Sequence, residues 1–157
     1  MKSVLHLKQN NSTTTPPKPP KIIFLDVDGV LNRAFAGNED FDEKCLEIFK
    51  DLVVSTGAKI VVHSSWKYSP EMLEKLRLKL AEYELEIYDV TPDFKMDRDV
   101  EILQWMKDHN FDKEHWVMLD DWDYRNKFGN RNIVTCSHGR IGLDEQWAEE
   151  AKKLLTE

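Results

Sequence analysis

Several residue types are scarce in this chain, and each scarcity narrows what the protein can be. Only two of its 157 residues are cysteine, which excludes a disulfide framework and favours a reducing, cytoplasmic setting. No apolar run is long enough to span a bilayer, and residues 1–20 lack the apolar core of a secretory signal. Positive charge is also in deficit, and the net charge of −7 argues against long-range attraction to nucleic acid.

The cysteines and histidines show no arrangement typical of a reactive or metal-binding site. Cys45 falls in a predicted helix and Cys136 follows a predicted strand, and we interpret both as small buried hydrophobic residues. The histidines at positions 63, 109, 115 and 138 lack the spacing of metal ligands, so we interpret them as surface or core residues. Neither residue type therefore indicates thiol chemistry or a zinc site.

The length of the chain fits one domain with a single hydrophobic core. Residues 1–20 are rich in Thr, Asn and Pro, and they are predicted to form a disordered leader with an extended proline-rich end. Residues 21–157 are then predicted to be the folded domain.

From residue 21 onward, apolar segments of strand length alternate with amphipathic segments of helix length. The predicted strands cover residues 22–25, 59–63, 85–88, 115–119 and 132–135. The first predicted helix starts at Asp40 or Asp42, ends near residue 56 and counts Phe41 on its apolar side; the others cover residues 69–83, 97–109 and 144–155. This alternation predicts an α/β fold, a doubly wound (Rossmann-like) five-stranded parallel sheet with helices on both faces.

The segment Asp26-Val27-Asp28-Gly29 directly follows the first predicted strand and carries the strongest functional signal. Side chains in a strand alternate, so Asp26 and Asp28 are expected to point the same way. Two carboxylates this close repel each other unless a cation lies between them or one keeps its proton. One of them could attack an electrophile while the other moves a proton. The simpler alternative is an Asp-Gly turn after a core strand.

Polar side chains also follow two further predicted strands. Ser64 and Ser65 come after the second strand, and Asp120 and Asp121 come after the fourth. Ligands bind beyond the carboxyl ends of the strands in such sheets, so these residues and the first Asp pair are expected at one edge. The strand-end position favours Ser64 over Ser65 as the ligand-binding hydroxyl.

With these motifs the sequence resembles the haloacid dehalogenase-like (HAD) hydrolases, most of which are magnesium-dependent phosphatases. The resemblance implies that Asp26 is the nucleophile, that Asp28 is the general acid and base, and that Ser64 binds the phosphoryl group. It also implies a Mg²⁺ site formed by Asp26, Asp120, Asp121 and the carbonyl oxygen of Asp28. A basic residue before the fourth strand is expected to contact phosphate, and both Arg98 and Lys95 qualify.

The segments 64–67, 98–102 and 142–143 further resemble the HAD domain of multifunctional (Swiss-army-knife) RNA-repair proteins. The segments between the motifs are used up by predicted strands and helices, which leaves no room for the cap domain that closes over small substrates in many HAD enzymes. An open site of this kind fits a macromolecular phosphate, such as the end of an RNA or DNA strand. The alternatives are a phosphatase of nucleotides or phosphoproteins, and a non-catalytic binding module with the same fold.

Residues around the motifs suggest where a nucleic acid could be held. Trp66 and Trp122 flank the predicted site and could stack a base, and cations that follow the fourth strand could contact the backbone. These cations are Arg125, Lys127, Arg131 and Arg140. The alternative is that the cations form a solvated loop and that the tryptophans pack into the core.

Overall fold

The computed structural model describes residues 19–34, 37–94, 97–111, 114–136 and 141–157. Most of the predicted leader lies outside these residues, as do Lys95 and Arg140. Among the helices of the described part of the chain, none is long and apolar enough to cross a membrane.

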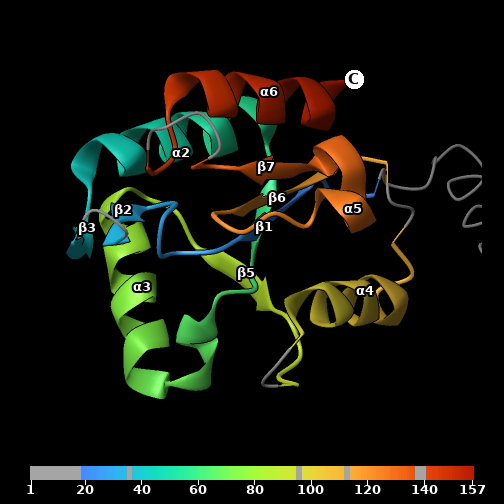
Figure 1. Cartoon of the computed structure of the whole chain (residues 1–157), viewed down its shortest axis with the longest axis horizontal. Helices are drawn as coiled ribbons and strands as arrows, with labels where there is room; N and C mark the ends of the chain where they lie inside the picture. The colour runs from blue at the N-terminus through green and yellow to red at the C-terminus, as the bar shows by residue number, and fades with distance from the viewer. Residues whose placement is uncertain (1–18, 35–36, 95–96, 112–113, 137–140) are drawn as a thin grey trace, which may run out of the picture.

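A five-stranded, fully parallel sheet forms the centre of the fold (Figure 1). Its strands are β1 (Ile22–Leu25), β4 (Lys59–Val62), β5 (Ile87–Val90), β6 (Trp116–Asp120) and β7 (Asn132–Val134), in the order β5-β4-β1-β6-β7. The chain first extends the sheet on one side of β1 and then returns to the other side, so the strand order reverses between β1 and β6. The predicted doubly wound α/β fold is confirmed.

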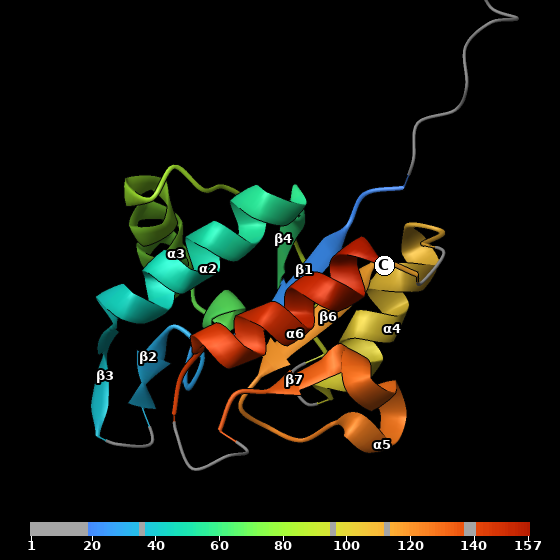
Figure 2. The same cartoon turned by 90° about the horizontal axis from the view of Figure 1, so that it is seen from above.

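Helices cover both faces of the sheet, and the alternation of side chains along β1 divides the core between them (Figures 1 and 2). Ile23 and Leu25 belong to the core cluster beneath α2 (Glu43–Thr56), α3 (Pro70–Glu82) and α6 (Glu145–Thr156). Ile22 and Phe24 point to the opposite face, where they pack with residues of α4 (Arg98–Asp108). Asp26, which continues this alternation, is thereby placed on the side of α4.

A short antiparallel hairpin after β1 was not predicted. Its strands are β2 (Asn32–Arg33) and β3 (Asn38–Phe41). Phe41 therefore lies in β3 and not on the first helix, and Asp42 rather than Asp40 caps α2 by accepting a hydrogen bond from the Cys45 amide. The hairpin is too short and too polar to show the apolar alternation by which a strand is recognised from sequence.

Two further differences concern β5 and the segment after β6. β5 begins at Ile87, two residues later than predicted, because buried Leu85 follows α3 in a turn in which Glu84 has a φ of 61°. The segment after β6 forms the short helices α5 (Arg125–Phe128) and η3 (Gly129–Arg131), and η2 (Ser65–Tyr68) follows β4. Between β1 and β5 the described residues form the hairpin, α2, β4, η2 and α3, and no separate cap domain.

Candidate active site

Asp26 lies at the carboxyl edge of the sheet, at the point where the strand order reverses. Its backbone N–H donates to the Leu119 oxygen at 3.0 Å, so it continues the ladder between β1 and β6. The same edge of β6 carries Asp120, the last residue of that strand, followed by Asp121. Two adjacent central strands therefore bring three carboxylates to one place, where ligands bind in sheets of this type.

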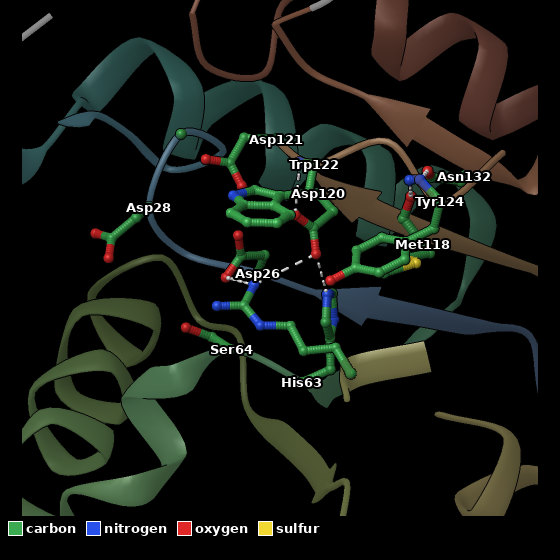
Figure 3. A network of polar contacts seen from close by, with 12 residues as sticks. Asp26, Asp28, His63, Ser64, Met118, Asp120, Asp121, Trp122, Tyr124 and Asn132 are labelled. Atoms are coloured by element: carbon green, nitrogen blue, oxygen red, sulfur yellow. Dashed lines mark hydrogen bonds and ion pairs between the residues drawn. The ribbon is translucent and has the colours of Figure 1, made fainter. Parts of the chain in front are cut away.

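The three carboxylates form a compact buried cluster (Figure 3). Asp26, Asp120 and Asp121 are each at most 9% exposed, and one oxygen of each lies within 4.8 Å of the others. Burial and the charge of Asp120 raise the pKa of Asp26 well above its usual range, and burial with the Asp120 carboxyl raises the pKa of Asp121 to about 7. Both pKa values rise because burial and a nearby negative charge disfavour the ionised form of each carboxyl group.

Arg98 is the cation that faces this cluster. It occupies the first position of α4, where a positive charge opposes the helix dipole. Its Nη1 lies 3.2 Å from Asp26 Oδ1 and 3.4 Å from Asp120 Oδ2, and these carboxylates raise its pKa against the effect of burial. Of the two candidate cations, Arg98 thus lies at the cluster, while Lys95 lies outside the described residues.

His63, which is interpreted from sequence as a surface or core residue, contacts the cluster directly. It follows β4 and is fully buried, and its Nε2 lies 2.7 Å from Asp120 Oδ2. Burial alone would raise the pKa of Asp120, but the hydrogen bond and charge of His63 lower it to about 2. His63 Nδ1 has no hydrogen-bond partner in the described part of the chain. The one signal in the sequence is its position at the end of the second predicted strand, directly before Ser64.

Asp28 is separated from the three-carboxylate cluster, as Figure 3 shows. The Asn32 side-chain amide donates to its Oδ1 at 2.9 Å, and the Trp66 indole donates to its Oδ2 at 3.2 Å. Asn32 Oδ1 also accepts from the Gly29 amide at 2.9 Å, which fixes the loop that carries Asp28. Trp66 is 6% exposed and packs against Phe41 of β3. It is therefore placed to hold Asp28, and its ring has little free surface for stacking a base.

Ser64 and Ser65 occupy different environments. Ser64 is buried at the end of β4, and its Oγ accepts from the Trp66 amide at 3.1 Å, which caps η2. A hydroxyl that accepts in this way still has its own hydrogen to donate to a ligand. Ser65 is exposed in the first turn of η2. Of the two serines, Ser64 is therefore the one that is buried beside the end of β4.

Gly29 is required where β1 turns away from the cluster. Its φ is +78°, and a Cβ at this position would lie 2.6 Å from Asp121 Cβ and 2.7 Å from Asp121 Oδ2. Its carbonyl oxygen accepts from the Thr135 hydroxyl at 2.7 Å, after β7. Only a residue without a side chain lets the two acidic segments approach this closely.

The residues after β6 form the other side of the site. Trp122 is 63% exposed, and its amide donates to Asp120 Oδ1 at 2.8 Å. Its exposed ring lies beside the carboxylates in Figure 3. Arg125 and Lys127 are exposed but paired, with Asp123 at 2.6 Å and with Asp99 of α4 at 2.5 Å.

Arg131 lies elsewhere. It donates to the Trp116 oxygen at 2.9 Å, and its guanidinium lies over the Trp116 ring. Trp116 is the first residue of β6, so this contact is at the amino edge of the sheet, opposite the acidic cluster. Arg131 therefore does not join the candidate site, although the sequence grouped it with the other cations.

A comparison with protein-family models identifies the fold family independently. The model of the HAD domain in Swiss Army Knife RNA repair proteins matches residues 22–148. The chain belongs to this HAD family. No curated protein matches the chain. The matched residues run from β1 into α6, and so include every carboxylate described above together with His63, Ser64 and Arg98.

The residues present fit the metal site that HAD membership leads one to expect. The three buried carboxylates offer only oxygen ligands, and hard oxygen ligands are those that Mg²⁺ prefers. Burial and the neighbouring carboxyl groups raise the pKa values of Asp26 and Asp121, and a divalent cation would offset the repulsion between these groups. The cluster can therefore hold a metal ion without rearrangement of the sheet.

Proposed function

We propose that this HAD domain is a magnesium-dependent phosphatase that works through an aspartyl-phosphate intermediate. The observation that carries the proposal is the contrast between the two Asp residues after β1. Asp26 lies in the acidic cluster against Arg98, whereas Asp28 is held apart by Asn32 and Trp66. A nucleophile and a proton donor need this separation, because they act on opposite sides of the phosphorus atom.

The proposed reaction has two steps. In the first, a carboxylate oxygen of Asp26 attacks phosphorus, the bond to the leaving oxygen breaks, and Asp28 donates its proton to that oxygen. In the second, Asp28 takes a proton from water, and this water attacks phosphorus and releases inorganic phosphate from Asp26. Asp28 thus regains its proton, and both carboxyl groups return to their starting state.

The remaining residues act on the charge of the phosphoryl group. Arg98 lies against Asp26, where its guanidinium can offset the negative charge that develops on the equatorial oxygens. Ser64 supplies a hydroxyl hydrogen at the end of β4. Bound Mg²⁺, held by Asp26, Asp120 and Asp121, would supply positive charge on the same oxygens. Each of these groups is set by a strand end or a helix start, so the site is preorganised.

For the substrate we propose a terminal phosphate of a nucleic acid, with RNA favoured by the family description. The described residues between β1 and β5 form a hairpin and helices but no cap that would enclose a small ligand. Trp122 offers an exposed aromatic ring beside the cluster, on which a base could stack. Arg125 and Lys127 are exposed cations of the same segment. Arg125 pairs with exposed Asp123 in a surface ion pair that is weak enough to exchange for a phosphate, whereas the partner of Lys127, Asp99, is largely buried.

Hydrolysis of an aryl phosphate tests the proposed chemistry. The wild-type protein is expected to release phosphate with Mg²⁺ and to lose this activity in excess chelator. Asp26→Asn keeps the shape of the side chain but removes the nucleophile, so turnover should fall about a thousandfold or more with an unchanged circular-dichroism spectrum.

Glu74→Gln is the matched control. It removes a carboxylate of α3 that pairs with Arg77 on the exposed surface, and it should leave turnover unchanged. If the wild-type protein binds phosphate but does not turn over any monoester, the domain is a binding module. Substantial activity in Asp26→Asn would exclude the aspartyl-phosphate mechanism.

A further inference from the structure

A second buried cluster of charges lies outside the three-carboxylate cluster, around Glu101 of α4. The Glu101 side chain is fully buried, and its Oε1 accepts from Lys67 Nζ at 2.6 Å. Its Oε2 accepts from the Tyr68 hydroxyl at 3.1 Å and from the Phe94 amide at 2.6 Å. Lys67 Nζ, on a side chain only 2% exposed, also donates to Thr91 Oγ1 at 2.7 Å. Both oxygens of Glu101 are thus used.

The partners of Glu101 come from two segments of the chain that meet α4 at the active edge. Lys67 and Tyr68 belong to η2, the turn that Ser64 caps. Thr91 and Phe94 follow the end of β5, in the segment that leads to α4. A single carboxylate on α4 therefore joins that helix to the ends of both β4 and β5.

Stability alone is a poor explanation for this arrangement. Removing two charges from water costs several kcal/mol for each ion, and apolar residues of similar size are often at least as stabilising. What an ion pair with fully used hydrogen bonds does provide is one fixed geometry. The element fixed here carries Arg98, which lies one helical turn before Glu101 and reaches Asp26 and Asp120.

We propose that Glu101 is a positioning residue that, through Lys67, sets Arg98 and the Ser64 turn at a fixed separation across the phosphoryl site. The inference rests on the proposed function, because the separation matters only if both groups contact one phosphoryl group. Arg98 stands at the first residue of α4, against the helix dipole, and Asp97 makes no side-chain hydrogen bond to cap this end. One turn further along α4, Glu101 is fully buried and has both carboxylate oxygens hydrogen-bonded, so it fixes this end of the helix.

A double-mutant cycle on kcat/KM tests this role. Glu101→Gln should lower kcat/KM for an aryl phosphate by about 10- to 100-fold, as is usual when a residue that orients a catalytic group is replaced. In an Arg98→Ala background, the same substitution should cause almost no further loss, because the group it positions is already absent. Its effect on the melting temperature should be the same in both backgrounds. Equal losses of kcat/KM in both backgrounds would overturn the proposal.

The Arg98 guanidinium provides a readout that does not depend on activity. In the metal-free wild-type protein its side-chain N–H protons should exchange slowly with solvent, because Nη1 is held between two carboxylates. Glu101→Gln should accelerate this exchange, measured by NMR, whereas Glu74→Gln should not. Unchanged exchange in Glu101→Gln would show that Arg98 is positioned without Glu101.

A second variant keeps the test decisive if Glu101→Gln leaves Lys67 unpaired and unfolds the protein. The double substitution Lys67→Met with Glu101→Leu replaces the buried pair with apolar groups, which proteins often tolerate. It should fold, yet show the faster Arg98 exchange and the lower kcat/KM. Wild-type behaviour of this variant would overturn the positioning role. If the wild-type protein hydrolyses no phosphate ester, the proposed function fails, and the exchange measurement still decides the role of Glu101.

Discussion

Asp26 and Asp28 are two residues apart, yet their carboxyl groups have different burial and different partners. Asp26 is buried among carboxylates, and its charge is offset by Arg98. Asp28 is half-buried and accepts hydrogen bonds from two neutral donors, Asn32 and Trp66. These donors fix the orientation of the Asp28 carboxyl group, apart from the other carboxylates.

The first prediction separates the two residues by the leaving group of the substrate. Asp28→Asn keeps the side-chain shape but cannot donate a proton to the leaving oxygen. An alkyl phosphate needs this proton, while an aryl phosphate with a good leaving group needs it much less. Turnover of the alkyl phosphate should therefore fall by about 10²- to 10⁴-fold, and that of the aryl phosphate by much less. Equal losses on both substrates would argue against Asp28 as the acid.

The second prediction concerns pH and the three carboxylates. Burial raises the pKa of Asp121 to about 7, above its value in the unfolded chain, so the folded metal-free protein binds more protons than the unfolded one between about pH 4 and 7. Its free energy of unfolding should therefore fall as pH rises through this window. Mg²⁺ must displace the same protons, so its apparent affinity should rise roughly tenfold with each pH unit for each proton displaced.

Thermal unfolding with chelator and with Mg²⁺, from pH 4 to 8, measures both effects. The difference in melting temperature between the two conditions should widen as the pH rises. Asp121→Asn removes one of the carboxyl groups whose pKa is raised and should make this dependence shallower. The lowered pKa of Asp120 acts separately, since its stabilisation is lost only as the pH falls below about 4 towards about 2. A metal effect that shrinks with rising pH would contradict the assignment.

The third prediction uses two glycines with the same backbone geometry. Gly29 and Gly57 have φ values of +78° and +71°, so replacement by Ala costs each about 1 kcal/mol or more in backbone strain. Only at Gly29 does the new Cβ also collide, because Asp121 Cβ lies 2.6 Å away, while nothing lies within 4 Å at Gly57. Gly29→Ala should therefore weaken Mg²⁺ binding, measured by calorimetry, and Gly57→Ala should only lower the melting temperature.

At the scale of whole elements, the sequence predicted those parts of the fold whose packing leaves a repeating pattern. β1 and β6 are buried on both faces, so they appear as continuous apolar runs, and the acidic residues that end them were recognised for that reason. The hairpin of β2 and β3 shows no such pattern, because it lies outside the main sheet and is held largely by polar contacts such as those of Asn32.

The partners of the proposed catalytic groups were harder to predict than the groups themselves. Asp26, Asp120 and Ser64 lie at or just beyond the carboxyl ends of strands, and the parallel sheet brings these ends to one edge. Glu101 and Trp66 depend on the angle at which α4 and η2 meet the sheet, which no local pattern encodes. Trp66 illustrates the difference, because its sequence position suggested a stacking surface and its packing against Phe41 turned it towards Asp28.

At the scale of the whole molecule, the distribution of charge limits the ways in which a nucleic acid could bind. The chain carries a net charge of −7, and two of the cations nearest the site are already paired with Asp99 and Asp123. Affinity for a nucleic acid must then come from local contacts rather than from long-range attraction. The exposed ring of Trp122 and the exposed cations Arg125 and Lys127 are the candidates for such contacts on the described surface.

The last prediction follows from these contacts. If the substrate is a strand end, kcat/KM should rise as the substrate is lengthened from a mononucleotide to a short oligonucleotide, and the gain should shrink with added salt. Trp122→Ala should remove roughly 5- to 100-fold of this gain, the usual worth of stacking one base. Arg125→Ala with Lys127→Ala should reduce the salt dependence of kcat/KM.

None of these changes should affect the hydrolysis of an aryl phosphate, because distant contacts contribute to binding and not to the reacting centre. Tyr88→Ala, which removes an exposed ring from the edge strand β5, is the control and should leave the length dependence intact. A mononucleotide or phosphopeptide hydrolysed as efficiently as any oligonucleotide would rule out the strand end as substrate.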